Sequence, residues 1–360
     1  MNSTFIDRLN KLYTEVDNSG YDGFYITNMT NIRYLTGFTG SAGLLIIYKN
    51  ESFFYTDGRY IQQSKEQVKN SKITIINSGY FESIEEDNIF KAQNLKIAFE
   101  SQHMSFSYYD GLSQKFSNVN WIATDSIIEN IAAIKDTTEI ESLKTAIEIT
   151  DDVFTKIIPE IKVGVTEKYI ATRISYLFKM NGAEGDSYES IIAGGPRSAL
   201  PHARPTDRKF KNGDFIVMDF GALYNGYHAD MTRTLVVGPP TTKHKEIYDI
   251  VLESHLNGIK KAKAGVACCD VDFACRNIIN QKNYGDFFTH STGHGIGLEV
   301  HTLPRIHKNN TELLKTNHVI TIEPGIYIPD WGGVRIEDDC LIQNDKCIPL
   351  NKSTKELISV

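Results

Sequence analysis

The feature that most restricts the fold is an apolar segment, residues 214–221, with a carboxylate in its middle. It reads Asp-Phe-Ile-Val-Met-Asp-Phe-Gly, so Asp219 lies among residues that favour a buried β-strand. Asn225-Gly226 follows, a strong signal for a two-residue type I′ hairpin turn. With that turn, Asp230 on the return strand lies opposite Gly221, and Asp219 is its diagonal neighbour on the same face. Two such carboxylates repel each other, so they need a cation between them or one must stay protonated.

A second pair of acidic residues repeats this pattern. Glu323 ends the apolar segment 319–323, and Glu337 stands on the return segment beyond the turn residues 329–333. A turn centred near Asp330 places the two glutamates opposite one another. The sequence therefore predicts two hairpins that each carry two carboxylates.

A histidine in a glycine-rich segment lies between the hairpins. His290 and His294 have the i, i+4 spacing of a helical zinc pair, but glycine at 293, 295 and 297 disfavours a helix. We therefore expect a glycine-rich loop that presents His294 alone.

Together these segments supply four carboxylates and one imidazole as candidate metal ligands. The five residues are Asp219, Asp230, His294, Glu323 and Glu337. The four carboxylates balance two divalent cations, and mostly oxygen ligands favour manganese, with cobalt, zinc and iron as alternatives. Two metals about 3.5–4 Å apart can share a water and lower its pKa, which gives a nucleophile for amide hydrolysis. Any one of these residues alone is more often a cap, an ion-pair partner or a loop residue, but five in this arrangement favour a metal site.

These motifs resemble those of the pita-bread metallopeptidases, which include methionine aminopeptidase, Xaa-Pro aminopeptidase and Xaa-Pro dipeptidase (prolidase). The resemblance rests on the segments 218–221, 293–298, 323–325 and 335–338, and on separations of eleven residues between the aspartates and fourteen between the glutamates. It implies that Asp219 binds one metal, that His294 and Glu323 bind the other, and that Asp230 and Glu337 bridge the two. Glu323 would also take the proton of the attacking water.

The resemblance also implies roles for three further residues. His202 matches a histidine that contacts the substrate around the scissile bond, and His301 matches one that stabilises the tetrahedral intermediate. Arg335 matches a basic residue beside the bridging glutamate that orients the site. The simpler alternatives are an exposed loop histidine for His202 and a structural ion pair for Arg335. Thr302 stands where the family often has an acidic residue, which affects fine tuning of the site rather than its metal ligands.

The N-terminal half narrows the choice within the family. Residues 31–41, Asn-Ile-Arg-Tyr-Leu-Thr-Gly-Phe-Thr-Gly-Ser, and 56–60, Thr-Asp-Gly-Arg-Tyr, resemble the creatinase-type N-terminal domain. Xaa-Pro peptidases and creatinases have this domain, and simple methionine aminopeptidases lack it. Creatinase works without metal and does not keep the full ligand set, whereas all five ligands are present here.

The 360 residues exceed what one hydrophobic core usually supports, so two domains are expected. Helical periodicity over 3–18 and 58–70 alternates with strand patterns near 21–27, 42–49, 52–56, 73–76 and 96–99, which predicts an α/β domain. The resemblance implies that this domain, over 1–133, is creatinase-like. Asp136 followed by Glu139 predicts a helix N-terminus with a capping box. Helices over about 166–180 and 243–263 and β-rich stretches over 214–237, 285–301 and 317–343 predict an α+β domain over 134–360, which the resemblance implies is a pita-bread domain.

Composition restricts partners and location. The net charge is −7 and no long basic run is present, which argues against a nucleic-acid partner. No signal peptide is readable, and no apolar run approaches the ~20 residues that a membrane helix needs. Five cysteines without a Cys-x-x-Cys pair indicate structural free thiols in a reducing, cytoplasmic compartment.

The leading interpretation is a Xaa-Pro aminopeptidase that releases the N-terminal residue of proline-containing peptides. Two alternatives remain open: a Xaa-Pro dipeptidase, which needs a group that binds the free carboxylate after proline, and a catalytically silent peptide-binding protein on the same fold. Tyr188, Tyr327 and Trp331 flank the motif loops and are candidates for a proline pocket, although ordinary packing is the simpler alternative. The resemblance also implies a homodimer, in which the N-terminal domain narrows entry to the site and forms a dimer contact.

Overall fold

A computed structural model describes the backbone of residues 2–360 and the side chains from residue 4 onward. The chain divides into two compact units, residues 2–132 and Ala133–Val360. Residue 1, which belongs to the first expected domain, lies outside the described residues.

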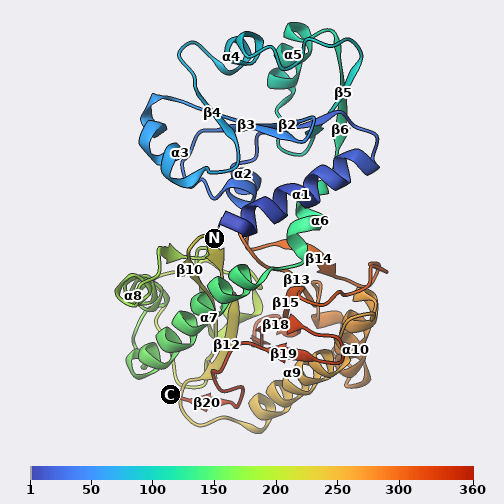
Figure 1. Cartoon of the computed structure of the whole chain (residues 1–360). Coiled ribbons are helices and arrows are strands. Elements are labelled where there is room, and N and C mark those ends of the chain that lie inside the picture. Colours follow the sequence, from blue (N-terminus) through green and yellow to red (C-terminus); the bar gives the residue numbers. More distant parts are fainter. Residues whose placement is uncertain (1) are drawn as a thin grey trace. The chain divides into compact units, whose positions relative to one another are not determined.

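The first unit is a six-stranded sheet in the order β4-β3-β2-β1-β5-β6, with helices on both faces. Its strands are β1 (Gly23–Ile26), β2 (Leu44–Tyr48), β3 (Glu51–Thr56), β4 (Lys72–Ile75), β5 (Leu95–Glu100) and β6 (Val119–Thr124). Its helices are α1 (Asn2–Asn18), α2 (Met29–Thr36), α3 (Ile61–Gln67), α4 (Tyr80–Glu86), α5 (Phe106–Lys115) and α6 (Ile127–Ala133). Figure 1 shows α4 and α5 on one face of the sheet and α1 with α2 on the other. The predicted α/β class is confirmed.

Two details of this unit differ from the sequence predictions. The helix predicted over 58–70 starts as a 3₁₀ turn, η1 (Gly58–Tyr60), and ends at Gln67, because the buried Val68 takes up an extended backbone. Helix α2 was not predicted, although Asn28 caps its first turn and Gly37 ends it in the left-handed conformation.

In the second unit, strands lie between two pairs of helices, α7 with α8 on one side and α9 with α10 on the other (Figure 1). The helices are α7 (Thr137–Ile157), α8 (Glu167–Met180), α9 (Thr242–Lys261) and α10 (Cys268–Gln281). The main sheets have the orders β20-β12-β9-β8 and β14-β13-β15-β18-β19, and smaller ones the orders β11-β10-β7 and β16-β17. The strands are β7 (Gly185–Asp186), β8 (Ile191–Gly194), β9 (Phe215–Phe220), β10 (Ala222–Tyr224), β11 (Tyr227–His228), β12 (Met231–Val236), β13 (Gly293–Gly295), β14 (Thr302–Ile306), β15 (Val319–Ile322), β16 (Gly325–Ile328), β17 (Gly332–Arg335), β18 (Asp338–Ile342), β19 (Cys347–Pro349) and β20 (Ile358–Ser359).

The helices of this unit largely follow the sequence pattern. Asp136 accepts from the Glu139 N–H while the Glu139 side chain accepts from the Asp136 N–H, which confirms the predicted capping box. Two apolar cores result: α7 and α8 pack on β9 and β12, and α9 and α10 pack on the strands around β15. Helix α10 was not predicted, and the stretch 285–301 contains little strand.

The first hairpin has the predicted register. Asn225 and Gly226 both have positive φ, 49° and 74°, and Tyr224 pairs with Tyr227 across a two-residue loop. Further along, Asp219 pairs with Thr232, so Asp230 and Asp219 are diagonal neighbours as predicted.

The second hairpin is divided between two sheets, but its residues pair in one continuous register. Gly325 pairs with Arg335 in one sheet, and Ile322 pairs with Asp338 in another. Glu323 and Glu337 lie opposite each other between these pairs, as predicted. Both stand where one sheet gives way to the next, and both side chains line the same cavity.

The predicted glycine-rich loop around His294 is wrong. His294 is the middle residue of β13, a short strand between β14 and β15. A Cβ at Gly293 would lie 2.0 Å from the Thr321 carbonyl oxygen, and one at Gly295 would lie 2.0 Å from that of Leu303. The glycines therefore permit close approach of neighbouring backbones within the sheet. In the sequence, the same glycine pattern cannot be distinguished from that of a loop.

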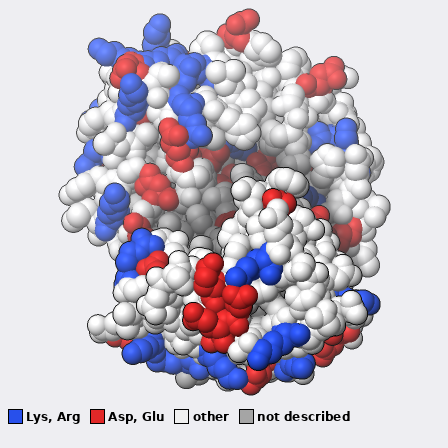
Figure 2. Space-filling view, turned by 90° about the horizontal axis from the view of Figure 1, so that it is seen from above, with Lys and Arg blue, Asp and Glu red and all other residues white. Residues whose placement is uncertain are grey.

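On the face shown in Figure 2, Lys and Arg side chains gather in several groups and Asp and Glu side chains in others, so neither sign of charge covers that face. Among residues 2–360, no helix combines the length and the apolar character that crossing a bilayer requires.

The tight contact at Gly221 predicts a large effect of one added methyl group. A Cβ there would lie 1.7 Å from the Ala229 carbonyl oxygen, whereas a Cβ at Gly185, in the neighbouring strand, meets nothing within 4 Å. Gly221→Ala should lower the free energy of unfolding by about 1–3 kcal/mol. Gly185→Ala should change it by no more than about 0.5 kcal/mol. Urea unfolding measures both, and equal stabilities of the two variants would contradict the hairpin geometry.

His318 predicts a loss of stability in mild acid. The ring is 1% exposed, and its Nδ1 accepts a hydrogen bond from the Lys315 N–H at 3.2 Å. Burial, together with Lys135 and Lys315, lowers the His318 pKa to about 4. The unfolded chain, with a histidine pKa of about 6.5, then binds more protons between these values, so stability is complete above pH ~6.5 and falls toward pH ~4.

The check is a pair of matched variants measured by urea unfolding at pH 7.5 and pH 5. In His318→Asn, the amide oxygen can replace Nδ1 as acceptor without titrating, so stability should depend less on pH. His307→Asn removes a partly exposed histidine with an equivalent Nδ1 contact, to the Asn309 N–H, and should keep the wild-type dependence. Wild-type behaviour of His318→Asn would show that this ring does not set the acid limit.

Candidate active site

All eight predicted site residues line one cavity of the second unit, with a volume of about 410 Å³. They are Asp219, Asp230, His294, Glu323, Glu337, His202, His301 and Arg335. They come from distant parts of the chain: β9, β13, β17, the joints between strands of both hairpins, the loop that follows β8 and the segment before β14. The hairpin registers and the pairing of β13 with β15 bring these segments together.

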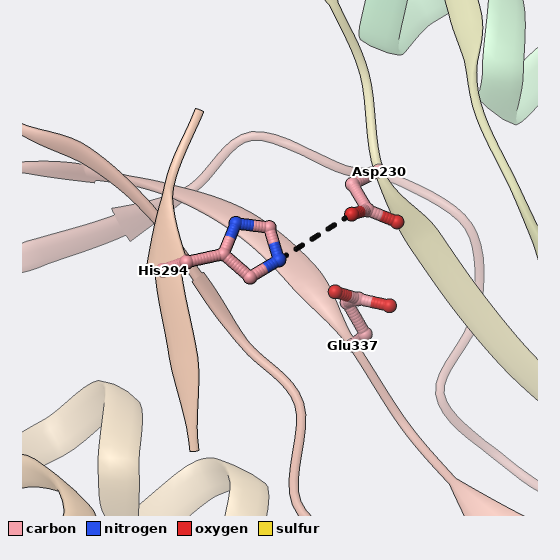
Figure 3. Close-up of side chains that lie close together, drawn as sticks. All are labelled: Asp230, His294 and Glu337. Atoms are coloured by element: carbon pink, nitrogen blue, oxygen red, sulfur yellow. Dashed lines mark ion pairs between the residues drawn. The ribbon is translucent and has the colours of Figure 1, made fainter. Parts of the chain in front are cut away.

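Three predicted ligands form the tightest group. Atoms of Asp230, His294 and Glu337 that could bind a metal lie within 4.8 Å of one another. Figure 3 shows the His294 ring directed at the two carboxylates, with its Nε2 3.7 Å from an Asp230 oxygen. The other two ligands adjoin this group. Glu323 Oε1 lies 3.3 Å from His294 Nε2, and the Tyr188 hydroxyl donates to both Asp219 and Asp230.

The charges of this group fit a divalent cation. Burial, followed by repulsion from neighbouring carboxylates, raises the pKa of Asp230 and of Glu337 well above the usual range. Burial, with His301 next, lowers the His294 pKa to about 3, so the ring is neutral. Its Nδ1–H donates to the Gly295 carbonyl oxygen at 3.0 Å, which leaves the Nε2 lone pair facing the carboxylates. Acceptors thus converge on acceptors, an arrangement that a metal ion would stabilise.

Arg335 forms the cationic side of the site. Its guanidinium is buried and donates to Asp219, to the Tyr327 hydroxyl at 2.7 Å and to the Thr232 hydroxyl at 2.9 Å. Thr232 in turn donates to Glu337 at 2.6 Å. Arg335 therefore contacts Asp219 directly and Glu337 through Thr232. These contacts fit both an orienting role and a structural ion pair.

The two predicted substrate histidines lie on the open side of the cavity. The His301 ring centroid is 4.3 Å from that of His294, and burial followed by the charge of Arg305 lowers the His301 pKa. The His202 ring is exposed and makes no hydrogen bond within residues 4–360. Both rings are free to meet a ligand that enters the cavity.

The three aromatic candidates for a proline pocket have different positions. Tyr188 lines the cavity, but its hydroxyl is engaged by the carboxylates. The Tyr327 hydroxyl bonds Arg335 and, at 2.9 Å, His290. Trp331 packs on Phe215 in an apolar core and does not line the cavity. Trp331 therefore packs against the core, as the simpler alternative predicted. Tyr327 does not line the cavity either, and the two tyrosines act as hydrogen-bond partners of the carboxylates, Arg335 and His290.

Further cavity residues carried no recognisable sequence signal. Arg305 lines the cavity with an exposed side chain that makes no ion pair or hydrogen bond within residues 4–360. Behind the site, the Asp339 carboxylate accepts from the Asp230 N–H at 2.9 Å, which fixes the backbone of a predicted ligand. Only the paired strands bring these residues to the ligands.

Comparisons with known proteins identify relatives of this chain. Residues 141–344 match metallopeptidase family M24, and residues 8–134 match the creatinase/prolidase N-terminal domain. A Xaa-Pro dipeptidase of Pyrococcus furiosus is 39% identical over 98% of this chain and 99% of its own length. A solved Xaa-Pro dipeptidase structure from Bacillus anthracis has a TM-score of 0.95 at 37% identity, covering 99% of this chain and 100% of that one. An X-Pro aminopeptidase structure from Thermotoga maritima has a TM-score of 0.90 at 36% identity, covering 98% and 99%.

Two alanine variants should separate metal binding from turnover. Asp230→Ala removes a central carboxylate and should abolish both bound metal and hydrolysis of Xaa-Pro substrates. His301→Ala removes a group beside the ligands, so it should keep near-normal metal content while turnover falls about a hundredfold or more. Metal analysis after dialysis and steady-state kinetics give the two readouts, and full activity in either variant would overturn the assignment.

Proposed function

Because the chain belongs to metallopeptidase family M24, we propose that it is a Xaa-Pro dipeptidase that uses two divalent cations, with manganese the expected metal. The fold is that of the family, a creatinase-type N-terminal domain followed by a pita-bread domain, and we place the boundary between residues 133 and 134. The sequence alone ranked the aminopeptidase first. The names of the relatives favour the dipeptidase at least as well.

The observation that carries the dipeptidase proposal is the unpaired cation of Arg305. A Xaa-Pro dipeptide ends in a free carboxylate directly after proline, and a guanidinium is the best partner for a carboxylate. Arg305 lies in the same cavity as the ligands, and its charge helps to lower the His301 pKa. The other cavity arginines have partners: Arg335 bonds Asp219, and Arg204 bonds Glu189 at 2.8 Å. Arg305 is therefore the cation available for the end of a short substrate.

The residues around the cavity then divide the reaction between them. Bound at the five predicted ligands, divalent cations would supply Lewis-acid charge and a water of lowered pKa. Glu323, whose own pKa is raised chiefly by burial, takes the proton of the attacking water. His202 contacts the substrate at the scissile bond, and His301 stabilises the oxygen that becomes negative. Arg335 keeps Asp219 in place through its direct ion pair.

The second candidate is a Xaa-Pro aminopeptidase, favoured by the Thermotoga maritima structure at similar identity. The two activities differ in the group that they accept after proline. An aminopeptidase accepts a continuing chain, whereas a dipeptidase requires the carboxylate.

Replacing Arg305 should therefore weaken binding only of substrates that end in a free carboxylate. Arg305→Met should raise the KM for a Xaa-Pro dipeptide about tenfold to a hundredfold, because one charged hydrogen bond contributes about 1.5–3 kcal/mol. The same variant should leave the slow cleavage of the dipeptide amide, which lacks the C-terminal negative charge, unchanged. Arg204→Met, which removes an arginine already paired with Glu189, should change the preference between the two substrates little. Wild-type protein that cleaves a Xaa-Pro-Xaa tripeptide as well as the dipeptide would make it an aminopeptidase.

A further inference from the structure

The loop that carries His202, residues 194–206, is closed at its neck by one buried carboxylate. Glu167, the first residue of α8, is 0% exposed. Its Oε1 accepts from the Gly194 N–H at 2.9 Å, and its Oε2 accepts from the Thr206 N–H at 2.9 Å and the Thr206 hydroxyl at 2.7 Å. The two ends of the loop are thus tied to the two oxygens of a single side chain, a compact Ω-loop arrangement.

Arg197 braces the inside of the same loop. Its Nε lies 3.1 Å from Glu167 Oε2, so it neutralises the buried charge. Its Nη2 donates to the Arg204 carbonyl oxygen at 2.6 Å, across the loop. The Arg197 side chain therefore links one side of the loop both to the neck and to the opposite side.

The far end of the loop reaches the active site. Arg335 donates to the Pro201 carbonyl oxygen at 3.3 Å, directly before His202. The Gly333 N–H donates at 2.8 Å to the hydroxyl of Ser198, within the loop. His202 itself makes no side-chain hydrogen bond within residues 4–360, so its position depends on the loop backbone.

We propose that Glu167 is a positioning residue for His202: by closing the neck of the 194–206 loop, it fixes where the imidazole meets the substrate. The role of His202 rests on the proposed function, but the closure of the loop does not. Glu167 lies on α8, outside the cavity, and acts only through the loop.

Glutamine is not a conservative replacement at this position. The carboxylate accepts backbone N–H groups on both oxygens, whereas a glutamine amide has only one acceptor oxygen. Its NH₂ group would face an N–H donor at Gly194 or Thr206, so one end of the neck is released. Glu160, near the same helix, offers a matched control, because it forms an ion pair with Arg173 at 2.8 Å but makes no contact with the loop.

The kinetic test is a double-mutant cycle on a Xaa-Pro dipeptide with saturating manganese. Glu167→Gln should lower kcat/KM about tenfold to a hundredfold, the effect of a small displacement of a reacting group. In the His202→Ala background the same change should have no more than about a twofold effect, because its route of action is already lost. Glu160→Gln should have little effect in either background, and bound metal should be unchanged in all variants.

A second test needs no activity and separates this proposal from the proposed function. Trypsin cuts after arginine, and Arg197 lies inside the loop. Glu167→Gln should be cut after Arg197 at least about fivefold faster than wild type if the neck protects it. Thr206→Val keeps the carboxylate and removes one neck bond, so it should show a smaller effect in the same direction and serves if Glu167→Gln does not fold.

The outcomes decide between positioning and a general role in stability. Faster cleavage after Arg197 together with a kinetic effect that vanishes in His202→Ala supports the proposal. Equal loss of kcat/KM in both backgrounds, or unchanged protection of Arg197 in a folded Glu167→Gln protein, overturns it. If no variant cleaves the dipeptide but the trypsin result holds, the loop closure stands and the proposed function fails.

Discussion

Repulsion among buried carboxylates is the constraint on which the arrangement of the second unit depends. Asp219, Asp230, Glu323 and Glu337 converge on one cavity, and burial raises the pKa of three of them. Charges this close are tolerated only with compensation. Part of it is built in: Arg335 bonds Asp219, and Thr232 donates to Glu337. Divalent cations, as expected for a member of metallopeptidase family M24, would compensate the negative charge that remains.

A second buried charge group lies behind the candidate ligands and joins the strands beside them. Asp338, directly after Glu337, bonds Arg233 at 2.7 Å, Lys355 at 2.8 Å and His255 at 3.1 Å. Burial alone would raise the pKa of Asp338, but these partners hold it well below its usual range. The other nitrogen of the His255 ring lies 2.9 Å from the Ile322 carbonyl oxygen, directly before Glu323. Buried ion pairs and a hydrogen bond therefore fix the backbone on both sides of the second hairpin. A metal site needs such support to hold its ligands at set distances.

The substrate side of the cavity is organised differently from the metal side. The candidate ligands stand on paired strands or at the joints directly beside them, whereas His202 stands on a loop whose geometry depends on the bonds of Glu167 and Arg197. Arg305 has an exposed side chain without a partner among residues 4–360. In the proposed function, the groups assigned to the metal are thus held by strands and their joints, while a braced loop and a free side chain are left to meet the substrate.

The sequence by itself determined the two hairpins, their registers and the five candidate ligands, because turn chemistry and strand periodicity are local. Asn225-Gly226 sets the pairing of Asp219 with Thr232 through the turn type alone. Only the tertiary structure decided that His294 lies in a strand, since its glycines respond to the carbonyls of Thr321 and Leu303. The same holds for Tyr188 and Glu167, whose partners are distant in the chain, and for Arg305, which lines the cavity beside residues distant in the chain. Their roles arise from packing between elements, which no local pattern encodes.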